Sequence, residues 1–325
     1  MTTLAYTVAT THYLGQAKAL ANSYKLHHPD SEFYIGLVDK LPADLDKEKI
    51  AGLNIVPVEA LGIPYFEEMN QRYRQVLLVW AMKSYFGQYF FDQFPDVNKI
   101  IYLDGDMMVY HPMTDLFQQL EKYEIVLTPH FVSTTPTSKE EYIEFHLTTG
   151  GAFNAGFFAM SRGDQSQAFL TWLTQKLRTR CAIPTGDQMW FNFIPIFFDK
   201  VLISKDVGLN MSFWNFENRQ LSLKEGRYFV NGAIPLKVYH FNGENPATGQ
   251  LFFQRASYYT PELRPEMVPF YEDYHLTLKE NDYDYFLQFP CYYYQQSKFS
   301  PKYLLFKGRE WLVRGLKKGL RMLLE

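Results

Sequence analysis

The stretch at residues 99–109, Lys-Ile-Ile-Tyr-Leu-Asp-Gly-Asp-Met-Met-Val, predicts a buried strand that ends in two carboxylates one residue apart. Aspartate and glycine are poor strand residues, so Asp104, Gly105 and Asp106 weaken the end of this strand unless another role compensates. Two acidic side chains at i and i+2 can converge on one hard divalent cation, whose remaining ligands are then often phosphate oxygens. A turn with solvated acids is the alternative, and the tripeptide alone does not separate the two.

Short apolar runs alternate with helical patterns along most of the chain. Helices are predicted at residues 14–27, 75–94, 165–180 and 189–193, and strands at 4–9, 33–38, 55–58, 125–128, 153–160, 201–203, 228–230 and 237–240. Hydrophobic residues make up 47 % of the 325, which is enough for a substantial core. The alternation predicts an α/β fold with a mixed central sheet and helices on both faces.

Three regions of the chain differ in composition. Residues 1–250 carry the alternating pattern and form one predicted domain, whereas residues 251–300 are tyrosine-rich and predict an irregular extension packed on it. Residues 301–325 hold seven basic and two acidic side chains, with leucines on one helical face. This pattern predicts an amphipathic helix that binds an anionic membrane surface. A helix docked on the protein's own core or on a dimer partner is the alternative.

Bulk properties exclude several classes of protein. The formal net charge of −3 argues against a nucleic-acid binder. Cys181 and Cys291 are the only cysteines, so neither a disulfide framework nor a cysteine metal site is expected. The first residues lack the charged and apolar regions of a signal peptide, and no run of 18 apolar residues predicts a membrane span. We therefore expect a cytoplasmic protein, peripheral at the inner face of the membrane if the last helix binds there.

His240 also follows a predicted strand, in Lys-Val-Tyr-His-Phe-Asn-Gly. In an open α/β sheet the carboxyl ends of the strands define the ligand crevice, so Asp104, Asp106 and His240 can meet there. Two carboxylates with one imidazole suit Mn²⁺ better than Ca²⁺, which prefers oxygen ligands, and no second histidine or cysteine lies nearby for Zn²⁺. The alternative for His240 is a buried histidine without a ligand.

Other polar residues interrupt apolar segments in the same way. The turn after the first strand, residues 7–13, has small and hydroxyl side chains that leave room for a ligand at a helix N-terminus. Lys83 lies in an apolar helix, where its charge needs a partner or an exit to water. Asn154 and Gly156 interrupt a strand, while Asp187 and Gln188 start a helix; turn or capping roles are the alternatives.

These motifs occur together and in order in one known group. The chain resembles the retaining nucleotide-sugar glycosyltransferases of family eight and their bacterial relatives, which have the A-type glycosyltransferase fold, a single Rossmann-like α/β domain. The resemblance covers about residues 4–245 and rests on seven stretches: residues 6–13, 81–86, 100–109 with Asp-Gly-Asp as the DxD element, 127–130, 153–158, 186–190 and 240–243.

The resemblance implies that Asp104, Asp106 and His240 hold Mn²⁺ or Mg²⁺ against the diphosphate of a UDP-sugar. It implies that the donor lies against Thr7, Ala9, Thr10, Tyr13, Lys83, Asp104, Gly105, Asn154, Gly156 and Gly243, and that Asp187 and Gln188 act at the reacting sugar. A hexose would pass, with retention, to a glycan or lipid-linked acceptor of the cell-surface polysaccharide or lipopolysaccharide type. Gln188 is not a carboxylate, which favours front-face displacement over a glycosyl-enzyme intermediate.

One position departs from the family pattern. Many members have a Lys-Pro-Trp segment after the histidine motif, whose lysine binds phosphate, whereas this chain has Glu244, Asn245 and Pro246. Two rival functions remain open. A sugar nucleotidyltransferase would need a glycine-rich, lysine-bearing N-terminal loop, which is absent, and a non-catalytic sugar-nucleotide or glycan-binding protein would not need the metal-binding set.

Overall fold

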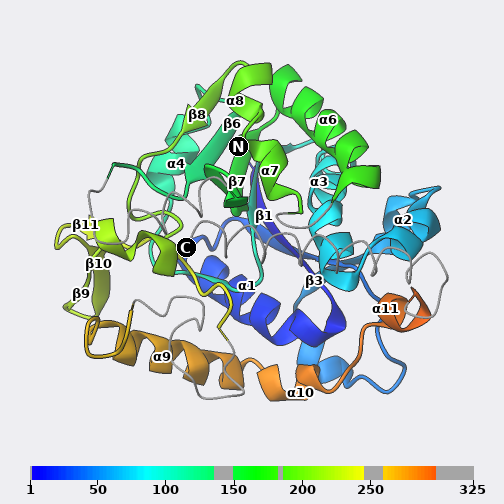
Figure 1. Cartoon of the computed structure of the whole chain (residues 1–325). Coiled ribbons are helices and arrows are strands. Elements are labelled where there is room, and N and C mark those ends of the chain that lie inside the picture. Colours follow the sequence, from blue (N-terminus) through cyan, green and yellow to red (C-terminus); the bar gives the residue numbers. More distant parts are fainter. Residues whose placement is uncertain (1, 135–148, 182–185, 245–258, 298–325) are drawn as a thin grey trace, which may run out of the picture.

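A seven-stranded sheet forms the centre of the computed structural model, which describes residues 2–134, 149–181, 186–244 and 259–297 (Figure 1). The strand order is β3-β2-β1-β4-β7-β6-β8. Its strands are β1 (Thr2–Ala9), β2 (Glu32–Leu37), β3 (Asn54–Pro57), β4 (Val97–Leu103), β6 (Ile125–Pro129), β7 (Phe153–Ser161) and β8 (Val201–Ile203).

The sheet is mixed. β1 pairs in parallel with β2 and β4, and β3 continues the parallel part beyond β2. β7 runs antiparallel to both β4 and β6, and β8 is parallel to β6. The mixed α/β sheet expected from the sequence is therefore confirmed, and each predicted strand of this sheet has a counterpart at nearly the same residues.

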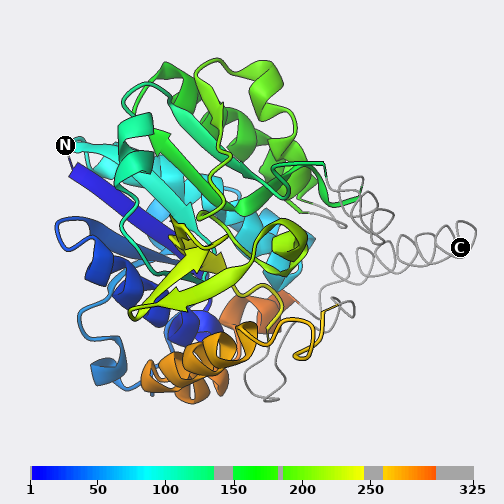
Figure 2. The same ribbon diagram turned by 90° about the vertical axis from the view of Figure 1, so that its left-hand side faces the viewer.

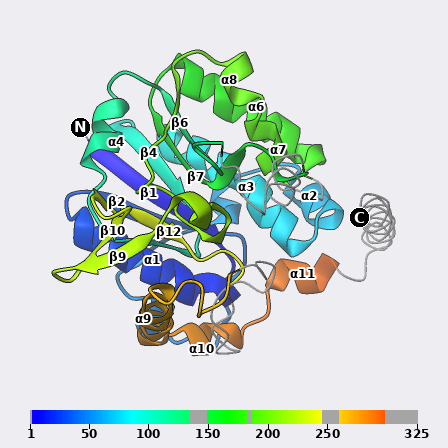
Figure 3. The ribbon, with the colours of Figure 1, turned by 60° about the vertical axis from the view of Figure 1, so that its left-hand side comes forward.

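Helices cover both faces of the sheet (Figures 1 and 3). Ile100 and Tyr102 of β4 point into the core below α3 and α6, while Ile101 and Leu103 point into the core below α1 and α4. This period of two explains why residues 100–103 of β4 are apolar on both faces of the sheet. The helices are α1 (Leu14–His27), α2 (Phe66–Arg72), α3 (Gln75–Gln93), α4 (Thr114–Gln119), α6 (Asp164–Arg180), α7 (Gln188–Phe191) and α8 (Ile194–Phe197), with 3₁₀ helices η1 (Thr11–Tyr13), η2 (Lys47–Ile50), η3 (Val58–Leu61) and η4 (Phe213–Asn218).

Two smaller sheets lie beside the main one. β5 (Met107–Val109) pairs antiparallel with β12 (Val238–His240), and this register sets His240 opposite Met107. The pairing therefore brings His240 next to the Asp-Gly-Asp turn that precedes β5. The second small sheet, β9 (Leu221–Lys224), β10 (Arg227–Val230) and β11 (Ile234–Pro235), lies beside α9 (Figure 2).

The tyrosine-rich region is helical in its described part, so the expectation of an irregular extension is wrong there. It contains α9 (Met267–Glu280), α10 (Tyr283–Leu287) and α11 (Tyr292–Ser297). Buried rings stabilise these helices; for example, Phe241 and Tyr274 stack with their ring centroids 3.6 Å apart. α9 and α10 pack against α1. The helix expected at residues 301–325 lies outside the described residues.

Asp39 joins the start of α11 to the turn that follows β1. Its carboxylate is fully buried and accepts hydrogen bonds from the backbone N–H of Thr11 at 3.0 Å and of Tyr292 at 2.7 Å. One side chain thus connects the turn after β1 to α11. In the described part of the chain, no helix is both long and apolar enough to cross a membrane.

Candidate active site

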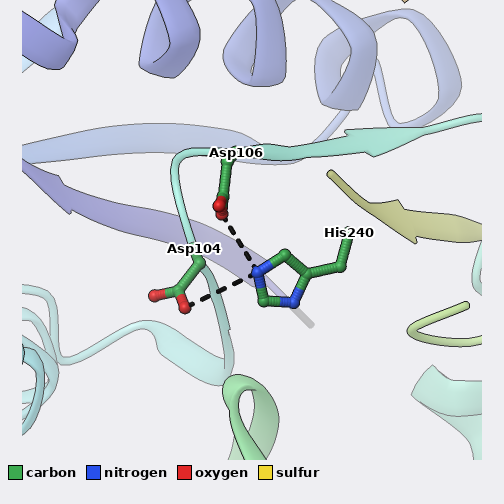
Figure 4. A group of neighbouring side chains, drawn as sticks. All are labelled: Asp104, Asp106 and His240. Atoms are coloured by element: carbon green, nitrogen blue, oxygen red, sulfur yellow. Dashed lines mark ion pairs between the residues drawn. The ribbon is translucent and has the colours of Figure 1, made fainter. Parts of the chain in front are cut away.

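Asp104 and Asp106 lie in the turn between β4 and β5, and His240 ends β12 (Figure 4). The His240 Nε2 atom is 3.1 Å from a carboxylate oxygen of Asp106 and 4.0 Å from one of Asp104. One ligand atom from each of the three residues lies within 4.8 Å of the others. The three side chains that the sequence singles out for a metal therefore meet at one point.

The surroundings of these side chains fit a divalent cation. Within the described residues, the Nδ1 atom of His240 is buried without a hydrogen-bond partner, and Nε2 has only its contacts with Asp106 and Asp104, so a ligand on this ring would offset the cost of burying it. A Cβ atom at Gly156 would come within 2.7 Å of Asp104 Oδ2 and 2.7 Å of His240 Cε1, so only glycine leaves this space open. Burial alone would raise the pKa of Asp106, but His240 outweighs it and holds that pKa below its usual value. A carboxylate kept ionised beside an imidazole is a suitable ligand set for Mn²⁺ or Mg²⁺.

The Lys83 side chain of α3 also contacts the turn between β4 and β5. Its Nζ atom is 3.1 Å from Asp104 Oδ1 and 3.2 Å from Asp187 Oδ2, and its side chain is 3 % exposed. The ammonium group also donates to the Ala155 carbonyl at 3.2 Å and lies over the Tyr102 ring. The cation that the sequence places in an apolar helix is therefore neutralised by two carboxylates of the protein itself.

Burial and charge shift the pKa values of this pair. Burial alone would lower the pKa of Lys83, but Asp104 and Asp187 more than offset it and raise that pKa to about 12. Burial raises the pKa of Asp187 to about 6, against the opposing effect of Lys83. Asp187 is the N-cap residue of α7, yet its side chain makes no capping hydrogen bond. The capping alternative for Asp187 is thus wrong, because its carboxylate turns toward Lys83.

Gln188 is held by hydrogen bonds at both ends of its amide. Its Oε1 atom accepts from Asn154 Nδ2 at 3.3 Å and from the Ala155 N–H at 3.2 Å, while its Nε2 donates to the Gly150 carbonyl at 2.7 Å. Asn154 in turn accepts from the Gly156 N–H at 3.0 Å and contacts His130. The network fixes the Gln188 side chain on the wall of the cavity next to the metal-ligand candidates.

These groups line one cavity of about 810 Å³. Most of the residues expected to bind the donor or act in catalysis lie on its wall: Ala9, Thr10, Tyr13, Lys83, Asp104, Gly105, Asp106, Asn154, Gly156, Asp187, Gln188 and His240. Two do not. Thr7 is fully buried behind Gly105, and Gly243 follows Asn242, which is the residue that lines the cavity there.

Several wall residues were not predicted from the sequence. Trp80 lies one turn before Lys83 on α3, Trp214 lies edge-on to His240 at 5.2 Å, and Tyr294 comes from α11. His12 and His130 also lie on the wall. The helical spacing of Trp80 and Lys83 is a signal that the sequence contains, since residues three apart share a face. Trp214 and Tyr294 carry no such signal, because distant segments bring them to the cavity.

A family model described as glycosyl transferase family 8 matches residues 4–245. The chain belongs to glycosyl transferase family 8. The resemblance stated from the sequence over about residues 4–245 is therefore confirmed, and the protein is a glycosyltransferase.

Two relatives of this family eight glycosyltransferase come from Bacillus subtilis (strain 168), and both are uncharacterized proteins. YfnF is 27 % identical over 249 residues, which cover 75 % of this chain and 82 % of YfnF. YfnD is 22 % identical over 290 residues, which cover 84 % of this chain and 88 % of YfnD. Among solved structures, the glycosyltransferase GlyE of Streptococcus pneumoniae TIGR4 matches with a TM-score of 0.51 and 15 % identity, over 90 % of this chain and 66 % of that chain. This likeness shows the A-type glycosyltransferase fold.

The position at which this glycosyltransferase departs from the family pattern is now visible. The Glu244 side chain is 2 % exposed, and its Oε1 atom is 3.2 Å from His275 Nε2 on α9. Glu244 therefore faces the tyrosine-rich helices, and it carries a negative charge where many family members have a lysine.

Proposed function

We propose that this glycosyltransferase transfers a hexose from a UDP-sugar to a glycan or glycolipid acceptor, with a bound divalent cation and with retention of configuration. The observation that carries the proposal is the meeting of Asp104, Asp106 and His240 around the space that Gly156 leaves open. The cavity beside this point is large enough for a nucleotide sugar.

The charges in the cavity support dependence on a metal ion. Lys83 is paired with Asp104 and Asp187, so its charge is not available to neutralise a diphosphate without breaking these contacts. Glu244 stands where many family members have a phosphate-binding lysine. Asp104, Asp106 and His240 would hold Mn²⁺ or Mg²⁺, which when bound supplies positive charge to a leaving diphosphate. Compared with the cationic side chains of the described residues, the bound ion would therefore be the main positive charge that faces the donor.

The sugar would lie at the end of the cavity formed by Asn154, Asp187 and Gln188. The two hydrogen bonds to Gln188 Oε1 fix the direction of its carbonyl dipole. A fixed carbonyl dipole stabilises positive charge without reorganisation, which suits a front-face displacement at the anomeric carbon. Asp187 would keep Lys83 in place, and the contact between Asn154 and Gly156 ties this end of the cavity to the metal-ligand candidates.

The nucleoside would lie at the turn after β1. Ala9, Thr10 and Tyr13 line the cavity there, and the Tyr13 ring is 51 % exposed, so it is free to stack on a base. Thr7 would act from behind Gly105, and Gly243 would approach the diphosphate through its backbone, which adopts a positive φ of 74°.

Hydrolysis of UDP-sugars in the presence of Mn²⁺ tests the proposal. We expect one UDP-hexose to be hydrolysed slowly without an acceptor, and we expect Asp106→Asn to abolish this activity. The exposed Asp44 offers the matched control, because Asp44→Asn changes one carboxylate far from the cavity wall. No hydrolysis of any UDP-sugar, with binding retained, would favour the non-catalytic binding protein. Release of diphosphate from a nucleoside triphosphate and a sugar phosphate would favour the nucleotidyltransferase.

Attachment of residues 301–325 to an anionic membrane is a separate part of the proposal, and it rests on the sequence alone. Replacing the seven Lys and Arg residues of this segment by Gln in the full chain should weaken sedimentation with anionic vesicles. Unchanged sedimentation would contradict a role for this segment.

A further inference from the structure

A cluster of apolar side chains is exposed on α7 and α8, next to the cavity. Met189, Phe193, Ile196 and Phe197 are 36 %, 39 %, 72 % and 56 % exposed. We call these four residues the α7–α8 patch. Phe193 and Phe197 stack with centroids 5.6 Å apart, so these two exposed rings form one apolar surface, and Met189 and Ile196 lie within four residues of Phe193 in the chain. Contiguous apolar surface of this kind marks a contact with another molecule or with a membrane.

Two tryptophans form the base of the patch. The Trp172 ring on α6 lies 5.7 Å from Phe197, and the Trp190 ring on α7 lies 6.2 Å from Phe193. Both tryptophans are partly exposed. Trp and Phe with aliphatic side chains on one surface are typical of proteins that lie in the interfacial region of a bilayer.

Basic side chains flank the patch on the carboxyl-terminal half of α6. The Lys176 ammonium is 5.8 Å from the centre of the Trp190 ring, and Trp190 Nε1 donates to the Arg180 carbonyl at 3.2 Å. Arg180 is exposed. Arg178 is exposed too, but its guanidinium lies over the Tyr65 ring and 3.7 Å from the exposed Glu68, so it faces α2 and does not belong to the basic flank. The exposed acids near the patch, Asp164 and Asp199, lie at the opposite end, beside the start of α6 and the end of α8. The α7 side of the patch is thus cationic.

We propose that the α7–α8 patch binds an anionic bilayer surface, with Met189 and Phe193 nearest the basic flank and Ile196 and Phe197 inserted among the lipids. The partner is a membrane rather than a protein, because basic side chains beside exposed aromatic and aliphatic ones complement anionic headgroups above an apolar layer. α7 begins at Gln188, which lies on the cavity wall. Docking here holds the cavity beside the membrane, within reach of a lipid-linked acceptor.

This surface is distinct from residues 301–325, so it can be tested in the full chain without altering that segment. Cys181 and Cys291 are buried, and burial raises the pKa of the Cys291 thiol to about 12, so an introduced surface cysteine can be labelled selectively. Ile196→Cys carrying an environment-sensitive dye should show a blue-shifted, stronger emission with phosphatidylglycerol vesicles. It should show little change with phosphatidylcholine vesicles. Leu26 is 77 % exposed, and Leu26→Cys with the same dye is the matched control that should not respond.

Binding measurements provide the second readout. Ile196→Ser with Phe197→Ser should lower the partition coefficient onto phosphatidylglycerol vesicles about tenfold or more. Arg180→Gln should lower it about fivefold. Leu26→Ser should leave it unchanged. Both sets of variants change exposed side chains, and a far-ultraviolet thermal melt checks that they fold.

Three outcomes overturn the proposal. The first is a dye at residue 196 that stays in water with vesicles present, and the second is an unchanged partition coefficient for the double variant. The third is a dye already shielded before vesicles are added, which would show that another segment of the chain or a second copy covers the patch. Donor hydrolysis without vesicles is a separate measurement. Its loss in Asp106→Asn with vesicle binding retained, or the reverse, separates failure of this proposal from failure of the proposed activity.

Discussion

The Nζ atom of Lys83 lies 3.2 Å from a carboxylate oxygen of Asp187, and both side chains are almost completely buried. The pair links α3 to the start of α7, and through Asp104 it also links both to the metal-ligand candidates. Burial of a cation between two carboxylates costs desolvation free energy, which the attraction between the charges must offset. Loss of one partner therefore destabilises the whole site.

Removal of Lys83 should destabilise the protein more than removal of Asp187. In Lys83→Met the buried carboxylate of Asp187 and the partly exposed one of Asp104 lose the cation between them, and we expect a loss of about 3 kcal/mol in the free energy of unfolding. Lys83→Met combined with Asp187→Asn should recover part of that loss. Urea unfolding of the two single variants and the double variant gives the coupling energy. Additive losses would contradict a direct interaction.

Gly156→Ala should abolish tight metal binding while the protein still folds. The added methyl group would lie 2.7 Å from both Asp104 Oδ2 and His240 Cε1, so these ligands must separate. Gly105→Ala is the comparison, because its Cβ would meet nothing nearer than Thr7 Oγ1 at 3.7 Å. Calorimetric titration with Mn²⁺ alone should show a much larger loss of affinity for Gly156→Ala than for Gly105→Ala. Equal affinities in the two variants would mean that the ion binds elsewhere.

Asp282 should stabilise the protein through two lysines. Its carboxylate accepts from Lys18 at 2.8 Å and from Lys49 at 2.7 Å, and these contacts outweigh burial and lower its pKa. Asp282 has a φ of 62°, a conformation that asparagine also tolerates, so Asp282→Asn isolates the charge. We expect this variant to lose about 1 kcal/mol of unfolding free energy at pH 7.

The sign of its pH dependence follows from the lowered pKa. The contribution of Asp282 is fully present above its unfolded pKa of about 3.9 and is lost as the pH falls through the lower folded value. The difference between wild type and Asp282→Asn should therefore vanish in acid, and it should shrink at high salt. Asp284→Asn changes an exposed acid on the same helix and serves as the control. A difference that persists at low pH would show that the charge is not responsible.

His28 should make the protein less stable as the pH falls from about 6.5 to 4. Burial lowers the pKa of His28 to about 4, and its Nε2 accepts from the Met113 N–H at 3.3 Å. The unfolded chain takes up the proton first, at about pH 6.5, so the stabilising contribution is present above 6.5 and lost toward pH 4. The expected slope is up to about 1.4 kcal/mol per pH unit. Urea midpoints at pH 7.5 and 5 should differ less in His28→Gln than in wild type, and an equal difference in the two proteins would show that His28 is not responsible.

The sequence predicts the central sheet well because its strands are local apolar runs. β4 can be recognised without its partner strands, since residues 100–103 are apolar on both faces of the sheet. The same local patterns predict that Asp104 and His240 end strands, and the pairing of β5 with β12 brings them together. The metal-ligand candidates could therefore be identified before the fold was seen.

The remaining features depend on contacts between distant segments. The helical character of α9 was missed because tyrosine-rich sequence is not typical of helices, and burial against Phe241 overrides this weak propensity. The sequence leaves a capping role open for the Asp187 carboxylate, because it does not show that Lys83 Nζ lies 3.2 Å away. Trp214 and Tyr294 reach the cavity only through tertiary packing, for which the sequence offers no periodic signal.

The carboxylate of Asp39 has a consequence for the order in which the molecule is completed during synthesis. It holds the turn after β1, which lines the cavity, and the helix that carries Tyr294, and these segments are about 280 residues apart in the sequence. A nascent chain still attached to the ribosome lacks that wall even when the central sheet has formed, since domains fold from the N-terminus as they emerge. The catalytic cavity is therefore finished only when α11 has left the ribosome, so a partly made chain holds an incomplete site.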